Sequence, residues 1–82
     1  MTRDVIFSSV QDIFRTVFDQ PELVIKNETS SADIEDWDSL NQINLIVAME
    51  KEFHIKFVLA DIQNLKNVGD MADLILKKNS LR

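Results

Sequence analysis

Apolar residues recur every three or four positions along most of this chain, which is the spacing of amphipathic helices. The first stretch of this kind begins after Thr2 or Asp4. Its apolar face is expected to consist of Ile6, Val10, Ile13, Phe14 and Val17. Because the residue before a proline avoids the helical region, we expect this helix to end just before Pro21.

A second helical stretch runs over residues 40–53 with no glycine or proline, and either Asp38 or Ser39 is a suitable N-cap. This stretch carries two apolar stripes. The stripe expected to face the core is Leu45, Ile46, Met49 and Phe53. The other stripe is Leu40, Ile43 and Val47. It lies below Ser39 and either packs under the loop or the third helix, or forms a contact patch for partners.

Two shorter helical stretches follow. Ile55 and Phe57 are expected to be buried in a link, and residues 58–65 are expected to hold a short third helix. Asn67 is the predicted N-cap of a fourth helix. Its buried face is predicted to be Val68, Met71, Ala72 and Ile75, with Lys77 and Lys78 at its end, and residues 79–82 are expected to form a frayed tail.

The remaining segment, residues 19–37, reads as a long loop. The residues expected to pin it to the core are Leu23, Val24, Ile25 and Ile34. Trp37, the only tryptophan, is expected to order the end of the loop, or else to contact partners. These elements predict an all-α fold of four helices in a single domain over residues 1–82.

Composition narrows the possible functions. The 82 residues carry a net charge of −5, which disfavours binding to nucleic acid and to anionic membranes. No apolar run reaches the length of a membrane span, and the N-terminus lacks the apolar core of a signal peptide. We therefore expect a monomeric cytoplasmic protein. Because the chain has no cysteine, any thiol used in thioester chemistry must be imported on a prosthetic group.

Catalytic and metal sites find little support. His54, the only histidine, lies fifteen positions after Ser39, which is about 22 Å along a helix, so a Ser-His pair is not expected. The acidic run from Asp33 departs from a calcium loop, because Asp38 and Asn44 stand where Gly and Glu are needed. A zinc site lacks ligands. We expect a protein that is not an enzyme and holds no metal.

The stretch Asp38-Ser39-Leu40, followed by an apolar helix ending in Met-Glu-Lys-Glu-Phe at residues 49–53, resembles the acyl carrier protein family. In that family the serine of Asp-Ser-Leu carries 4′-phosphopantetheine through a phosphodiester, which implies Ser39 as the attachment site. The start of a helix favours a phosphate there. The resemblance covers nearly the whole chain and implies a four-helix bundle with a long first loop and a short third helix.

The resemblance also implies a function. A phosphopantetheinyl transferase would load the arm covalently from coenzyme A. The arm would then carry acyl groups as thioesters to acyl-loading, condensing or acyl-transfer enzymes of fatty-acid, polyketide or related biosynthesis. Partner contacts are expected from Asp38, Leu40, Ile43, Val47 and Glu50, the last being positioned for a cation of the partner.

Some features differ from the familiar fatty-acid carriers and leave alternatives open. No glycine precedes Trp37, and Asn41 and Asn44 stand where acidic residues are common, which indicates a specialised member. An aminoacyl or peptidyl carrier of the same fold, or an unmodified helical interaction module, also fits the sequence. A space that could shelter cargo is expected between Ile46, Met49, Phe53, Ile55, Phe57 and Ile62.

Overall fold

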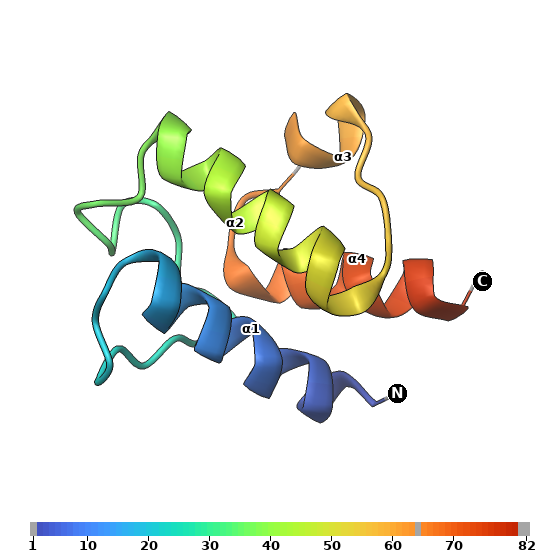
Figure 1. The fold of residues 1–82 in the computed structure, drawn as a ribbon, viewed down its shortest axis with the longest axis horizontal. Coiled ribbons are helices and arrows are strands. Elements are labelled where there is room, and N and C mark those ends of the chain that lie inside the picture. The colour runs from blue at the N-terminus through green and yellow to red at the C-terminus, as the bar shows by residue number, and fades with distance from the viewer. Residues whose placement is uncertain (1, 64, 81–82) are drawn as a thin grey trace.

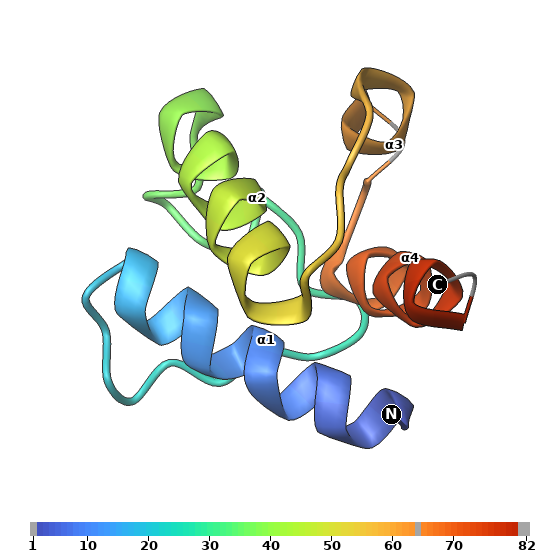
Figure 2. The same ribbon diagram turned by 45° about the vertical axis from the view of Figure 1, so that its right-hand side comes forward.

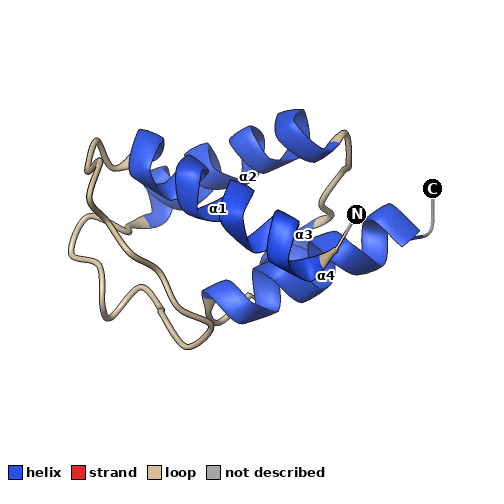
Figure 3. Cartoon of the chain, turned by 90° about the horizontal axis from the view of Figure 1, so that it is seen from below, coloured by secondary structure: helices blue, strands red, loops and turns tan. Residues whose placement is uncertain are grey.

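The computed structural model describes residues 2–63 and 65–80, and this part of the chain contains four α-helices and no strand (Figure 1). The helices are α1 (Arg3–Val17), α2 (Ser39–Phe53), α3 (Leu59–Gln63) and α4 (Val68–Ser80). Figure 3 shows that long loops connect them, above all the loop between α1 and α2. The predicted all-α fold with a long first loop and a short third helix is confirmed. None of the described helices is both long and apolar enough to cross a membrane.

Helix α1 begins and ends through identifiable contacts. The Val5 amide donates to the Thr2 hydroxyl at 3.3 Å, so Thr2 is the N-cap. At the other end Asp19 takes a left-handed conformation with φ of 53°. The amides of Asp19 and Gln20 then donate back to the Thr16 and Arg15 carbonyls. This backbone reversal ends the helix before the proline is reached.

The core lies between α1 and the two helices that it contacts, α2 and α4 (Figure 2). Each helix contributes the face that its apolar spacing predicts. The buried residues of these three helices are Ile6, Val10, Phe14, Leu45, Ile46, Met49, Phe53, Val68, Met71, Ala72 and Ile75. Ile13 and Val17 pack against this cluster while remaining half-buried. Helical periodicity therefore predicted the part of the core that these three helices supply.

The loop between α1 and α2 is attached to the core by fewer residues than expected. Ile25 and Ile34 are buried and Leu23 is half-buried. Val24 is 65% exposed, so its predicted burial is wrong. The extended segment presents neighbouring side chains to opposite sides, and Ile25 takes the inward direction.

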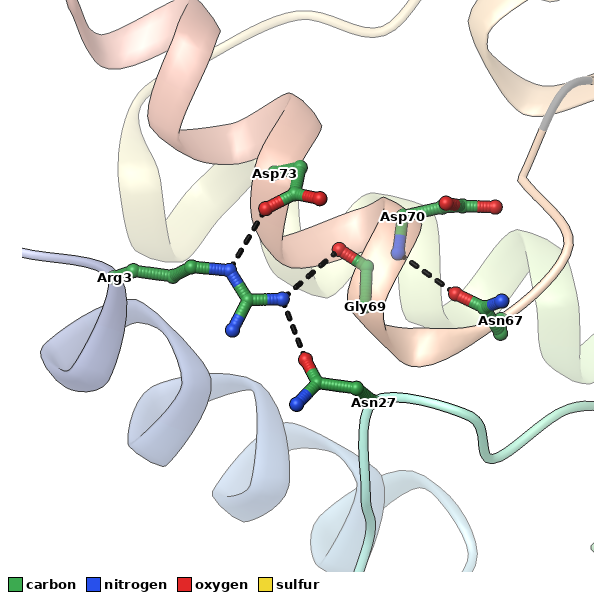
Figure 4. Close-up of polar contacts among 6 residues, drawn as sticks. All are labelled: Arg3, Asn27, Asn67, Gly69, Asp70 and Asp73. Carbon is green, nitrogen blue, oxygen red and sulfur yellow. Dashed lines mark hydrogen bonds and ion pairs between the residues drawn. The ribbon is translucent and has the colours of Figure 1, made fainter.

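The same loop is also bonded to the first turn of α4. The Gly69 amide donates to the Asn27 carbonyl at 2.8 Å. A Cβ atom on Gly69 would lie 3.0 Å from that oxygen, so a larger residue there would push the Asn27 backbone away by a few tenths of an ångström. Arg3 adds contacts to Asn27, to the Gly69 carbonyl and to Asp73 (Figure 4). The start of α1, the loop and the start of α4 are therefore held together at one place.

Helix α4 is longer than predicted. Asn67 is its N-cap, as expected, and its side-chain oxygen accepts from the Asp70 amide at 2.8 Å (Figure 4). The helix continues to Ser80, so the predicted frayed tail is wrong for residues 79 and 80, while residues 81 and 82 lie outside the described part. The Asn79 side chain donates to the Ile75 carbonyl, which supports the last turn.

Helix α3 is the most loosely held element. None of its residues is buried, and it stands away from α1 in Figure 2. The link before it is better anchored, because Ile55 and Phe57 are buried as predicted. The amide of Phe57 also donates to the Glu50 carboxylate at 2.9 Å. An ion pair of 2.8 Å between Asp61 and Lys78 joins α3 to α4.

Candidate functional site

Ser39 is the first residue of α2, and its side chain is exposed. The capping role belongs to its neighbour. The Asn41 amide donates to the Asp38 carboxylate at 2.8 Å, and the Gln42 amide donates to the Asp38 carbonyl at 2.8 Å. Asp38 is therefore the N-cap, and Ser39 is not needed for this role. The hydroxyl of Ser39 makes no hydrogen bond with any described residue. It is therefore free for chemistry.

The backbone around Ser39 suits a phosphate. Within the described residues, the amides of Ser39 and Leu40 have no acceptor, since Asp38 accepts only from the amides of Asn41 and Gln42. Unpaired amides at the start of a fifteen-residue helix carry the positive end of its dipole. A phosphodiester on Ser39 would lie beside these donors, which is a favourable place for an anion. The local geometry therefore fits a phosphate-linked group.

Trp37 holds in place the end of the loop that leads to Ser39. Its ring packs edge-on against Phe14, with centroids 5.1 Å apart, and its Nε1 donates to the Gln42 side chain at 2.6 Å. The Asn41 side chain donates to the Asp36 carbonyl at 2.6 Å. These bonds tie the end of the loop to the first turn of α2 and to the core. The prediction that Trp37 orders the loop is confirmed.

A surface cavity of about 510 Å³ opens beside Ser39. Trp37, Ser39 and Ile43 line one side, and Ile62, Leu65 and Lys66 line the other. The volume is within the range of small-molecule sites. Neither Leu65 nor Lys66 is among the site residues that the sequence predicts. These residues meet Ser39 only through the tertiary fold, so no local spacing indicates their proximity.

The second apolar stripe of α2 does not pack under the loop or the third helix. Leu40, Ile43 and Val47 are 67%, 60% and 43% exposed. These residues follow Ser39 along the helix and form an uncharged surface, to which Asn44 adds an exposed amide. An exposed apolar stripe beside a reactive serine is a candidate contact surface.

The sequence predicts that the Glu50 carboxylate is available to a cation of a partner, but this carboxylate is already bonded within the chain. Glu50 is half-buried, and one of its carboxylate oxygens accepts from the Phe57 amide. The donor of this bond belongs to a residue beyond the end of α2, which no spacing along the helix indicates. Asp38 is exposed, yet one of its oxygens serves as the cap.

His54 lies at the far end of α2 from Ser39. It is exposed and left-handed, with φ of 55°, and its amide donates to the Glu50 carbonyl. It therefore ends the helix and cannot pair with Ser39, as the sequence predicts. Across the described residues, no group of three His, Cys, Asp or Glu side chains is placed to hold a metal ion.

Comparisons with known proteins agree with this geometry. The family described as phosphopantetheine attachment site matches residues 8–75. The acyl carrier protein of Acidothermus cellulolyticus is 31% identical over 92% of this chain and 89% of its own length. That of Thermotoga maritima is 32% identical over 94% and 95%. The solution structure of holo acyl carrier protein from Geobacter metallireducens matches with a TM-score of 0.87 and 49% identity, over 93% of this chain and 87% of that chain. The chain therefore belongs to the phosphopantetheine attachment-site family, among the acyl carrier proteins.

Proposed function

We propose that Ser39 is the residue through which this acyl carrier protein bears 4′-phosphopantetheine. The observation that carries the proposal is the free, exposed hydroxyl at the start of α2, next to the unpaired amides of Ser39 and Leu40. A thiol at the end of the arm would hold acyl groups as thioesters. Such a thiol is needed, because the chain has no cysteine of its own.

In the attachment step, coenzyme A is the donor of the phosphopantetheine group. The Ser39 oxygen attacks the phosphorus that bears the pantetheine, and a new phosphodiester bond forms. The bond between the two phosphorus atoms through oxygen breaks, and adenosine 3′,5′-bisphosphate leaves. A base must accept the serine proton. His54 lies at the opposite end of α2, so the transferase has to supply that base.

The residues of this chain then bind and position. The amides of Ser39 and Leu40 stabilise the phosphate charge. Lys66, across the cavity, adds a cation near the same place. Ile43, Ile62 and Leu65 offer the arm an apolar surface. None of these groups performs acid–base chemistry, so the chain serves as a carrier and the partner enzymes supply the catalysis.

We further propose that the partners are a phosphopantetheinyl transferase and acyl-handling enzymes that dock on the exposed stripe of α2. The exposure of Leu40, Ile43 and Val47 supports this surface, because they contribute little to the core. The relatives are named acyl carrier proteins, which favours acyl cargo over the aminoacyl or peptidyl cargo that the sequence left open.

Mass spectrometry tests the attachment site. Incubation with coenzyme A and a broad-specificity transferase should add the mass of one phosphopantetheine, and Ser39→Ala should prevent the addition. Ser31→Ala is the matched control, because Ser31 is exposed and lines the same cavity. That variant should be modified normally. Modification of Ser39→Ala, or an added mass that maps to Ser31, would refute the proposal.

A further inference from the structure

One face of α2 connects the serine with a second cavity at the far end of the helix. At 100° per residue, Ser39, Ile43, Val47 and Lys51 fall within one third of the helix circumference. Near the end of α2 this face opens into a cavity of about 630 Å³. Val47 and Ile55 contribute apolar surface to it, and Lys51, His54, Lys56 and Lys78 contribute basic groups. We name this cavity the basic groove.

The basic groove retains unpaired positive charge, although the chain as a whole is acidic. Lys51 and Lys56 are exposed, and neither forms an ion pair or a hydrogen bond with any described residue. Lys78 is paired with Asp61. Glu50, the acid that lines the groove, keeps its negative charge while it accepts from the Phe57 amide, and the three lysines of the groove outnumber it. Favourable interaction with the helix dipole accounts for Lys51 in the last turn of α2, while Lys56 lies beyond that helix.

Unpaired negative charge lies at the opposite end of the same helix. Glu35 and Asp36 are exposed, and their carboxylates have no partner among the described residues, whereas Asp33 and Asp38 bond to neighbouring groups. Between these acids and the basic groove lies the apolar stripe with Asn44. The separation from Ser39 to Lys51 is about 18 Å at 1.5 Å per residue. The candidate docking surface is therefore negative at one end, neutral in the middle and positive at the other end.

We infer that the enzymes docking on α2 insert an acidic segment, with an apolar side chain between its carboxylates, into the basic groove. The inference rests on the proposed function, because the docked enzyme must also reach the arm on Ser39. Carboxylates held apart on a peptide match the separate ammonium groups of Lys51 and Lys56, and an apolar side chain matches Val47 and Ile55. A small anion matches less well, because it would leave the apolar surface of Val47 and Ile55 uncovered.

Opposite charges at the two ends of the surface fix the orientation of the partner. A partner docked in the reverse direction would bring its carboxylates to Glu35 and Asp36, and its cations to Lys51 and Lys56. Such like-charge contacts oppose association and select against wrong orientations. A partner with a uniformly basic surface would be repelled by the groove. The same partner would not be repelled by a helix that is acidic along its whole length.

The test is an NMR titration of the ¹⁵N-labelled Ser39→Ala chain with an acetylated and amidated peptide, Glu-Leu-Glu-Glu-Leu-Glu. We expect saturable shifts at the amides of Val47, Lys51, His54 and Lys56. The double variant Lys51→Glu/Lys56→Glu should bind about two- to thirtyfold more weakly, as for two exposed charge pairs. The control Lys26→Glu/Lys77→Glu changes the net charge equally outside the groove and should bind normally. Melting curves should show that both double variants are folded.

Several results would overturn the inference. They are equal weakening in both double variants, equal binding of a peptide with glutamine in place of glutamate, or the absence of saturable shifts at the groove. Saturation of the same amides by inorganic phosphate, without saturation by the peptide, would indicate a small-anion site instead. Because Ser39 is absent from the titrated chain, these outcomes are independent of the modification assay. Failed modification with intact peptide binding would refute only the attachment site.

Discussion

The carboxylate of Asp61 lies 2.8 Å from the ammonium group of Lys78, and this ion pair joins α3 to the last turn of α4. Both side chains are 22% exposed. The Val58 amide donates to the same carboxylate at 3.1 Å. Lys78 also lies 5.8 Å from the centre of the Phe57 ring. Since no residue of α3 is buried, this cluster is a principal attachment of that helix.

Replacing Asp61 by Asn should loosen α3 without unfolding the bundle. The amide oxygen can still accept from the Val58 amide, but the ion pair with Lys78 is lost. We expect faster hydrogen exchange in residues 59–63 and unchanged exchange in α1, measured by NMR. Asp73→Asn is the matched control, because it breaks an ion pair with Arg3 in which no residue of α3 takes part. Unchanged exchange of α3 in Asp61→Asn would show that other contacts hold it.

The attachment of α3 should also depend on pH. The hydrogen bond from Lys78 and that from the Val58 amide lower the pKa of Asp61 below its ordinary value of 3.8. A lowered pKa in the folded state means that the stabilisation is present above pH 3.8 and is lost as the pH falls through the folded value. The Val58 amide signal should shift in this acid range in the wild type. It should stay constant in Asp61→Asn, and a titration that persists there would point to another carboxylate.

Charges introduced on the exposed stripe of α2 should impair modification more than stability. Ile43→Asp and Val47→Asp place a carboxylate in water, so the free energy of unfolding should change by about 0.5 kcal/mol or less. Modification by the transferase should slow by about tenfold if these residues contact it. Ile46→Asp is the buried control and should lower the melting temperature sharply. An equally large loss in Ile43→Asp would place that stripe in the core.

Trp37 should stabilise the chain through two separable contacts. Trp37→Phe retains a ring against Phe14 but loses the hydrogen bond to Gln42, which should cost about 1 kcal/mol. Trp37→Ala loses both contacts and should cost about 3 kcal/mol. Urea denaturation followed by circular dichroism measures both values. Equal costs for the two variants would show that the packing against Phe14 contributes nothing.

Acyl cargo should stabilise the chain in proportion to its length if it enters the bundle. Each methylene removed from water contributes about 0.8 kcal/mol. Ordering a residue of α3 around the cargo costs about 1–2 kcal/mol for the backbone. A medium-length chain should therefore raise the melting temperature above that of the unloaded form and slow hydrogen exchange in residues 55–63. Equal melting temperatures for unloaded, short-chain and medium-chain forms would place the cargo outside.

The sequence predicts those parts of the fold that depend on neighbours within one helix. The face of α4 from Val68 to Ile75 and the caps at Asp38 and Asn67 follow from spacings of three and four residues, and the structure agrees. The start of α2 was located for the same reason. The sequence leaves both Asp38 and Ser39 as candidate caps. Only the hydrogen bonds of the structure show that Asp38 is the cap and that the Ser39 hydroxyl is free.

Contacts between distant segments were not predictable in this way. The ion pair of Lys78 with Asp61 and the cavity that Lys66 shares with Ser39 both join segments whose relative position depends on the whole fold. The predicted burial of Val24 is wrong for a related reason, because a loop has no regular period that shows which of its apolar residues turns inward. The basic groove likewise depends on a distant residue, because Lys78 of α4 lines it together with Lys51 and Lys56.

The start of α2 lies at the opposite end of the molecule from the start of α1 and the end of α4 (Figure 1). The longest dimension of the molecule is 33 Å. A reporter, a surface anchor or a second protein joined at either end of the described chain would therefore be held well away from Ser39. Forms immobilised or fused at the start of α1 should therefore keep Ser39 accessible to large enzymes, whereas a fusion after α4 would begin close to Lys78 and the basic groove.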